Sequence, residues 1–180
     1  MHTPTQNGTP FQYSPAALAE VQGLTKKYPE GRGKSAILRA LHIAQEENQG
    51  WLSVPAMDHV AEVLGITSIE VYEVASFYSM YNLEPVGKYV LEFCHTGPCA
   101  IEGAERLIEY TKLKLGIGKN QTTPDGLFTI KEVECLGACG YAPMMQVGEF
   151  FHEHLTEEKM DRFIEDCRAG KIDKGTWKMH

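Results

Sequence analysis

Apolar residues in the N-terminal half recur every three or four positions, which is the spacing of amphipathic helices. Four such stretches predict four short helices. The first opens at Ser14-Pro15, a serine N-cap followed by proline in the first turn, and ends before Pro29. The expected buried faces of the four helices are, in chain order, Leu18, Val21 and Leu24; Ile37, Leu38, Leu41 and Ala44; Met57, Val60, Ala61 and Leu64; and Val71, Val74, Ala75 and Tyr78.

Polar residues and glycine mark the ends of the other three helices. Ser35 is the expected N-cap of the second helix and Ser53 that of the third, which Gly65 would end. Thr67 and Glu70 have the spacing of a capping box for the fourth helix. Because the connecting loops are brief, these stretches together predict a four-helix bundle.

The pattern changes after residues 82–87, where proline and glycine interrupt the helical spacing. Residues 88–94 are strand-like, and residues 127–135 alternate apolar and polar side chains, which predicts two strands. A turn at residues 124–126 precedes the second strand. Each strand leads directly into a pair of cysteines.

The rest of the C-terminal half predicts a hairpin around Gly148, built from residues 144–147 and 149–152, and a last helix capped by Thr156. Another helix is expected between the two strands. The apolar faces of these two helices are Ala104, Leu107, Ile108, Thr111 and Leu115, and then Met160, Phe163, Ile164 and Cys167. The resulting order, β-α-β-β-α, is typical of a thioredoxin-like domain.

The segments combine into an α+β (or α/β) protein. A length of 180 residues suits one domain or two small ones. We expect a flexible polar arm at residues 1–12, the four-helix bundle at residues 13–82, a thioredoxin-like domain at residues 83–168 and a C-terminal tail at residues 169–180.

Composition narrows the range of functions. The chain is 43% apolar and 23% charged, with a formal net charge of −7, and it shows no basic stripe of the kind that binds nucleic acid. No apolar run approaches the roughly 20 residues that cross a bilayer. The first ten residues resemble neither a signal peptide nor a transit peptide. We therefore expect a cytosolic, reducing location, where five cysteines favour metal or catalytic chemistry over disulfides.

Two pairs of cysteines indicate the chemistry. Cys94-x4-Cys99 and Cys135-x3-Cys139 both lie among glycine, alanine and proline. Structural zinc often uses C-x2-C pairs, which are absent from both loops. The wider, unequal spacing suits a [2Fe–2S] cluster, because each pair can hold one iron. Small residues in the loops let backbone N–H groups turn toward the sulfurs.

Three alternatives to a cluster are a single structural zinc ion held by all four cysteines, four unrelated reduced thiols, and disulfide redox chemistry, which normally uses C-x-x-C. His95 adjoins Cys94, and we expect it to be a neighbour of the site rather than a ligand. Cys167 falls on the apolar face of the last helix, which predicts a buried, inert thiol.

Charged residues near the cysteines bear on the redox potential. Glu92, Glu102, Glu132 and Glu134 are close in sequence, whereas Lys131 is the only similarly close fixed positive charge. Negative potential disfavours an added electron. We therefore predict a low-potential cluster.

The remaining side chains offer weaker signals. His152 and His154 alternate on an expected strand, and surface histidines are favoured there over a second metal site. For the aromatic residues that end the fourth helix, we weigh core packing against a docking face for a larger partner. These residues are Tyr72, Phe77, Tyr78 and Tyr81. The sequence contains neither a G-x-G-x-x-G motif nor a Walker loop, so we expect no substrate site and infer that the chain is one part of a larger enzyme.

The segments CHTGPC and ECLGACGYAP closely resemble the NuoE family, the small [2Fe–2S] subunit of respiratory NADH:quinone oxidoreductase (complex I). The resemblance extends over about residues 13–168 and leaves out the tail with Trp177, whose role is open. It implies a helical bundle followed by a thioredoxin-like [2Fe–2S] ferredoxin domain. The cluster ligands that it implies are Cys94, Cys99, Cys135 and Cys139.

The same resemblance implies the partners. A flavin-bearing subunit of the NuoF type would bind NADH and FMN, and this chain would exchange single electrons with the FMN within the peripheral arm, on the cytoplasmic side of a membrane-bound respiratory complex. The same module occurs in NAD-linked formate dehydrogenases and soluble hydrogenases, which are alternatives. An alternative of another class is a structural adaptor stabilised by zinc. Binding to nucleic acid and direct insertion into a membrane are not expected.

Overall fold

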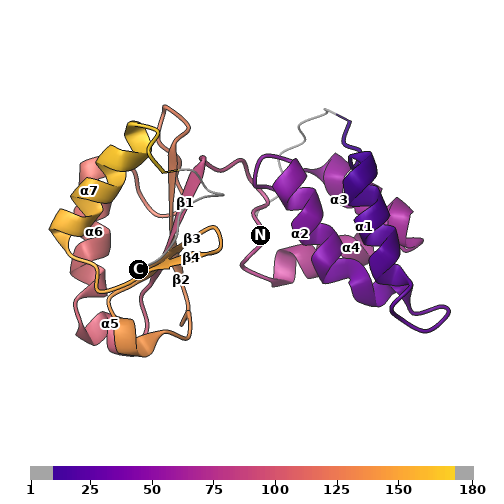
Figure 1. The fold of residues 1–180 in the computed structure, drawn as a ribbon, viewed down its shortest axis with the longest axis horizontal. Coiled ribbons are helices and arrows are strands. Elements are labelled where there is room, and N and C mark those ends of the chain that lie inside the picture. The colour runs from indigo at the N-terminus through magenta and orange to yellow at the C-terminus, as the bar shows by residue number, and fades with distance from the viewer. Residues whose placement is uncertain (1–9, 173–180) are drawn as a thin grey trace. The chain divides into compact units, whose positions relative to one another are not determined.

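The computed structural model describes residues 10–172 and divides between Pro85 and Val86 into two compact units (Figure 1). Most of the expected arm (1–12) and most of the expected tail (169–180), including Trp177, lie outside the described residues. Within the described part of the chain, no helix has both the length and the apolar composition needed to span a membrane.

The first unit is helical. Its elements are α1 (Pro15–Thr25), the short 3-10 helix η1 (Gly33–Ala36), α2 (Ile37–Glu47), α3 (Val54–Leu64) and α4 (Ser68–Phe77). They enclose one apolar core, in which Val21, Leu41, Leu52, Val60 and Val71 have no exposed surface. Removing this surface from water is the main force that holds the short helices together.

The helix ends mostly follow the predicted signals. The hydroxyls of Ser14 and Ser53 accept hydrogen bonds from the N–H groups three residues further on, in α1 and α3. Thr67 and Glu70 form the capping box of α4, and Gly65 ends α3 in the left-handed conformation, with φ of 66°. These signals act within one turn of helix, so the local sequence is sufficient to specify them.

Three predictions for the first unit are wrong. Ser35 does not cap α2, because η1 occupies the preceding turn and Ala36 takes the N-cap position without a side-chain bond. Leu38 and Tyr78 were expected in the core, but they are exposed. Ala40 and Ile43 are buried on α2 beside the expected Ile37, Leu41 and Ala44, so the buried face lies on the side away from Leu38.

The second unit contains a four-stranded sheet in the order β2-β1-β3-β4. Its strands are β1 (Tyr89–Cys94), β2 (Phe128–Val133), β3 (Met145–Val147) and β4 (Phe150–His152). β1 and β2 are parallel, whereas β3 runs antiparallel to both β1 and β4. The hairpin around Gly148 and the strand order confirm the predicted β-α-β-β-α arrangement.

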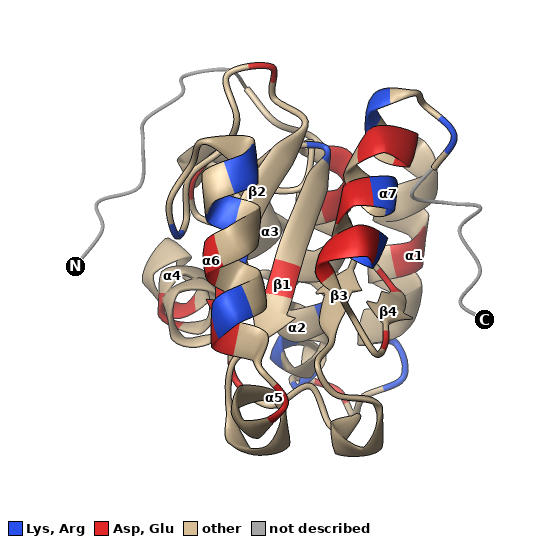
Figure 2. Cartoon of the chain, turned by 90° about the vertical axis from the view of Figure 1, so that its left-hand side faces the viewer, with Lys and Arg blue, Asp and Glu red and all other residues tan. Residues whose placement is uncertain are grey.

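Helices α6 (Ala104–Leu115) and α7 (Glu157–Arg168) cover one face of this sheet, and α5 (Gly97–Ile101) is a short helix directly after β1 (Figure 1). Tyr89, Leu91, Phe128 and Ile130 contribute to the core of this unit from the sheet. Figure 2 shows charged residues, in blue and red, at many positions along the two covering helices.

Oppositely charged side chains link α6 to α7. Arg106 lies 2.8 Å from Glu157, and Lys114 lies 2.5 Å from Asp161. Each of these pairs is partly exposed, so their contribution to stability is modest beside that of the core.

The second unit tests three predictions about single cysteine and histidine residues. Cys167 is buried in the core, as predicted. His152 was expected at the surface, but it is only 7% exposed, because β4 pairs it with Met145 on the face that α7 covers. His154 lies beyond the strand and is exposed, as predicted.

Candidate metal centre

The four paired cysteines start from the same end of two neighbouring parallel strands. Cys94 is the last residue of β1, and its partner in the ladder is Val133, the last residue of β2. The N–H of His95 donates to the carbonyl oxygen of Val133 at 3.3 Å. The first ligand loop (residues 95–99) and the second ligand loop (residues 134–139) therefore leave the sheet side by side.

The first pair is buried. Cys94 and Cys99 are 2% and 1% exposed and share a small apolar cluster with Ala104 and Met144. Cys99 lies in α5, a short helix that no sequence pattern predicted, and its N–H donates to the carbonyl of Thr96 at 3.1 Å. This turn brings Cys99 back toward Cys94.

The second pair lies at the surface. The Sγ atoms of Cys135 and Cys139 are 3.6 Å apart, and both residues are exposed. The N–H of Gly137 donates to Cys135 Sγ at 3.4 Å. Gly137 has φ of 82°, a left-handed conformation that glycine adopts without strain, and this lets the loop fold back on its own sulfur.

The two pairs differ in acidity. Burial would raise the pKa of Cys94, but N–H groups of Thr96 and Leu136 donate to its sulfur and bring the pKa below its ordinary value. Burial, followed by the neighbouring Cys94, raises the pKa of Cys99 to about 11. Because Leu136 belongs to the second ligand loop, its bond to Cys94 joins the two loops at the sulfur itself.

Electrostatic coupling also connects the pairs. Cys135 raises the pKa of Cys139 most strongly, and Cys94 of the other loop raises it further. Within residues 10–172, no three or more His, Cys, Asp or Glu side chains converge on a position for one metal ion. The thiols are arranged as two adjacent pairs, which fits a two-iron cluster with one pair per iron better than a single tetrahedral ion.

A second layer of contacts supports the loops. The N–H of Cys94 donates to the carbonyl of Met144 at 3.2 Å, and Met144 follows a cis peptide bond between Ala142 and Pro143. The N–H of His154 donates to the carbonyl of Tyr141 at 2.9 Å, and the two rings are 5.7 Å apart. Sequence reasoning did not find this tie, because nothing in the local pattern relates residue 141 to residue 154.

The structure places more positive charge near the loops than the neighbouring sequence positions indicate. Glu132 lies 2.7 Å from Lys112 Nζ and 3.0 Å from Lys119 Nζ. Glu92 is the ladder partner of Lys131, and burial raises the pKa of Glu92 against the opposing effect of that lysine. The two additional lysines come from distant positions in the sequence and offset part of the expected negative charge. The low potential stays a prediction, with these two lysines now part of the charge balance.

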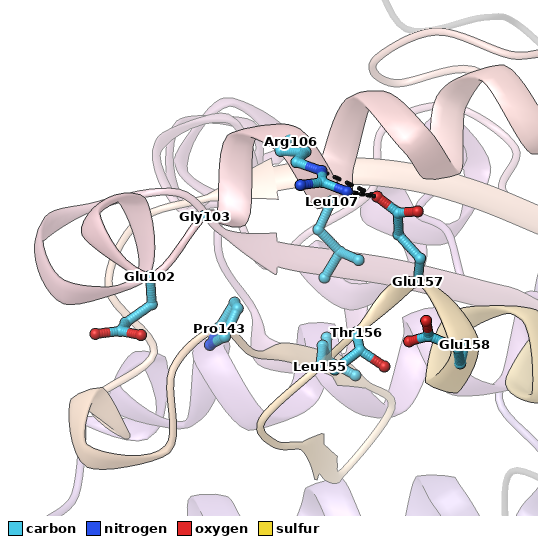
Figure 3. Close-up of a pocket in the computed structure, with 9 residues that line it drawn as sticks. All are labelled: Glu102, Gly103, Arg106, Leu107, Pro143, Leu155, Thr156, Glu157 and Glu158. Carbon is cyan, nitrogen blue, oxygen red and sulfur yellow. Dashed lines mark hydrogen bonds and ion pairs between the residues drawn. The ribbon is translucent and has the colours of Figure 1, made fainter.

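A pocket of about 290 Å³ lies between the start of α6 and the start of α7 (Figure 3). Pro143 and Leu155 contribute apolar walls, and Arg106 reaches across to Glu157 at its rim. Two further glutamates, Glu102 and Glu158, also line it. The thiols do not line this pocket, so the candidate site is the pair of cysteine loops.

Comparison with known proteins places these features in a family. The sequence model described as "Thioredoxin-like [2Fe-2S] ferredoxin" matches residues 21–168, which include all four paired cysteines. One fold relative is an NAD+-reducing [NiFe]-hydrogenase, with a TM-score of 0.66 and 20% sequence identity over 77% of this chain. The chain spans only 24% of that hydrogenase chain, so this likeness concerns the fold alone.

Relatives with higher identity are similar over most of their length. The E subunit of NADH-quinone oxidoreductase from Rickettsia felis is 44% identical over 88% of this chain and 95% of its own length. The protein of the same name from Rickettsia typhi is 43% identical over 92% of this chain and 96% of its own. NADH dehydrogenase [ubiquinone] flavoprotein 2 of Dictyostelium discoideum is 41% identical over 92% of this chain and 67% of its own. With its sheet order, its two thiol pairs and these relatives, the chain belongs to the thioredoxin-like [2Fe-2S] ferredoxin family.

Proposed function

We propose that this chain is an electron-transfer subunit of an NADH:quinone oxidoreductase. It would carry one [2Fe–2S] cluster, with Cys94, Cys99, Cys135 and Cys139 as ligands. The observation that carries the proposal is the meeting of two thiol pairs at one end of β1 and β2. Similarity over nearly the whole chain to proteins named as the E subunit of NADH-quinone oxidoreductase supports it.

Each part of the site has a chemical task. The four cysteines bind as thiolates, and the N–H groups of Leu136 and Gly137 offset their negative charge. When bound, the cluster supplies one-electron transfer. The first pair is covered by Met144, whereas Cys135 and Cys139 are exposed. Electrons would therefore enter and leave on the side of the second pair.

The proposed partner is a flavin-bearing subunit of the NuoF type, which would hold both NADH and FMN. The sequence of this chain contains no glycine-rich dinucleotide motif of its own, which is consistent with that division of tasks. This chain would exchange single electrons with the FMN, in contact with other subunits of the peripheral arm, on the cytoplasmic side of a membrane-bound respiratory complex.

The helical unit is proposed to form a four-helix bundle that contributes to docking. Phe77 is 79% exposed and its ring lies 5.0 Å from that of Tyr78, which is also exposed. Exposed aromatic side chains are more common at protein–protein contacts than on free surfaces. These two residues therefore favour the docking interpretation of the aromatic set, whereas Tyr81 is buried and belongs to the core.

Metal analysis tests the cluster assignment. The chain, purified without oxygen, should contain the iron and acid-labile sulfide of one [2Fe–2S] cluster and show its visible absorption. Cys135→Ala should abolish both, because one iron loses a ligand. Cys167→Ala is the matched control, since that cysteine is buried away from the loops, and it should keep full iron content. Wild-type protein that holds a single zinc ion, or no iron after reconstitution, would contradict the proposal.

Capture of the partner tests the respiratory assignment. Affinity purification of the chain from its native cell, with identification of co-purified subunits, should recover the subunits of NADH:quinone oxidoreductase. Recovery of formate dehydrogenase or hydrogenase subunits instead would replace the respiratory assignment with one of the alternatives.

A further inference from the structure

The second ligand loop, residues 134–139, depends on the end of β2 for its starting position. Its two cysteines are exposed, although Leu136 and Ala138 between them pack against the small apolar cluster of the site. The loop begins directly after Val133, whose carbonyl oxygen is bound by the N–H of His95. Whatever holds the last residues of β2 therefore sets where the second pair of thiols starts.

Glu132, the residue before Val133, is held by two lysines. Its Oε1 lies 2.7 Å from Lys112 Nζ, and its Oε2 lies 3.0 Å from Lys119 Nζ. Each carboxylate oxygen thus has its own partner, so rotation of the side chain would break at least one contact. Lys112 is oriented in turn by Glu109, 2.7 Å away on the same helix.

The pair of Glu132 and Lys112 is more sheltered than a usual surface ion pair, whereas Lys119 is 49% exposed. The side chains of Glu132 and Lys112 are only 18% and 19% exposed. Solvent and salt screen such a pair less than an exposed one. Lys112 hydrogen-bonds the carboxylate and Lys119 does so too, and these contacts lower the pKa of Glu132 against the opposing effect of burial.

The two lysines come from different segments that are themselves fixed to the fold. Lys112 belongs to α6, which packs on the core face of the sheet. Lys119 belongs to the connection before β2, where the N–H of Asn120 donates to the carbonyl of Ile130 at 2.7 Å. The carboxylate of Glu132 therefore joins the end of β2 to a covering helix and to a neighbouring segment at the same time.

We propose that Glu132 is a positioning residue for the second ligand loop: bound by Lys112 and Lys119, it fixes the end of β2 and so holds Cys135 and Cys139 in place to receive metal. The inference rests on the proposed function. The claim that Glu132 holds the loop in place applies also to the metal-free chain, where it can be tested separately.

Three variants distinguish the loss of the tie, meaning the ion pairs of Glu132 with Lys112 and Lys119, from the change in local charge. Glu132→Gln removes one negative charge and breaks the tie. The double variant Lys112→Gln with Lys119→Gln breaks the same tie but removes two positive charges. Glu134→Gln is the matched control, because Glu134 is exposed, adjoins Cys135 and has no ion pair among the described residues. It removes a negative charge nearby and leaves the tie intact.

Hydrogen exchange of the metal-free chain gives the first readout. Amides of residues 133–139 should exchange roughly threefold to tenfold faster in both variants that break the tie, as expected when a partly buried contact of this size is lost. The control should match wild type. Unchanged exchange in Glu132→Gln, a faster rate in only one of the two tie-breaking variants, or an equally fast rate in Glu134→Gln would overturn the proposal. Far-UV circular dichroism verifies that each variant is folded.

The cluster-loaded chain gives the second readout. The visible circular dichroism of the cluster should change in both tie-breaking variants and stay unchanged in Glu134→Gln. The midpoint potential should become more positive in Glu132→Gln and Glu134→Gln and more negative in the lysine variant, because an added electron responds to charge. Unaltered cluster spectra in both tie-breaking variants would overturn positioning. Wild-type chain that takes up no iron would instead refute the proposed function, and the exchange data would still decide whether Glu132 orders the loop.

Discussion

At the scale of single residues, His152 has the largest consequence for stability at mildly acidic pH. Its ring lies edge-on to Phe163, with 4.7 Å between the ring centres, and burial lowers its pKa to about 4. In an unfolded chain, histidine titrates near pH 6.5. Between these values the unfolded state binds more protons than the folded state. Stability from the neutral ring is therefore complete above about pH 6.5 and is lost as the pH falls toward 4.

We predict that His152→Gln weakens this pH dependence. Through His152, the wild-type free energy of unfolding should fall by an amount on the order of 3 kcal/mol between neutral pH and pH 4. The variant should show a smaller fall, because glutamine does not titrate. Urea unfolding at several pH values measures both curves, with the exposed His154→Gln as control. Parallel curves for wild type and His152→Gln would contradict the prediction.

The error in placing His152 has a physical origin. A strand of three residues offers almost no alternation from which to assign faces, and the sequence Phe-Phe-His is compatible with either orientation. Its pairing with β3 decides the matter, because Met145 and His152 share a rung and Met145 is buried. Such a register is set by the whole sheet and not by the residues of one strand.

At the scale of secondary-structure elements, N-caps determine where the helices of the first unit begin. Ser53 is 4% exposed, and its hydroxyl accepts a hydrogen bond from the N–H of Ala56 at 3.3 Å. An N–H at the start of a helix has no partner within the helix, so the cap satisfies a group that would otherwise be buried without one.

We predict that Ser53→Ala destabilises the chain by about 1 kcal/mol, the usual cost of losing an N-cap. Ser76→Ala is the matched control, because Ser76 is exposed on α4 and caps no helix. It should change stability by less than about 0.5 kcal/mol. Chemical denaturation followed by far-UV circular dichroism compares the two variants, and an equal loss in both would refute the role of the cap.

Caps and turns were predictable because their signals lie within a few residues. The same holds for the cysteine pairs, whose spacing and small neighbours are visible in the sequence. The short helix α5 was missed, because five residues around a glycine and a proline show no helical periodicity. The ties of Glu132 to Lys112 and Lys119 were missed for another reason: they depend on how α6 lies on the sheet, which no local pattern encodes.

At the scale of the whole molecule, the second unit leaves apolar side chains exposed next to its ligand loops. Ile101, at the end of α5, is 85% exposed, and Tyr141, just after Cys139, is 51% exposed. Exposed apolar groups beside a redox site indicate a contact surface, since electron transfer requires that the partner come close. Leu113 is equally exposed, at 83%, but it lies in the last turn of α6, at the opposite end of that helix from α5.

We predict that Ile101→Asp weakens binding to the proposed flavin-bearing subunit by roughly tenfold, the effect of losing about 1.4 kcal/mol at an interface. Leu113→Asp introduces the same charge at similar exposure and should leave the affinity within about twofold of wild type. Titration of the purified partner, followed by calorimetry or co-purification, measures both. Equal weakening by the two variants would show that added charge, and not the surface beside the loops, is responsible.

The pairing of β1 with β2 would also determine when the protein can receive the proposed cluster. Cys94 ends β1, whereas the second pair lies beyond β2, so only sheet formation unites the four donors. A nascent chain on the ribosome that has exposed only Cys94 and Cys99 offers two of the four proposed thiol ligands. With the proposed ligands, uptake of the cluster would therefore follow the folding of the second unit.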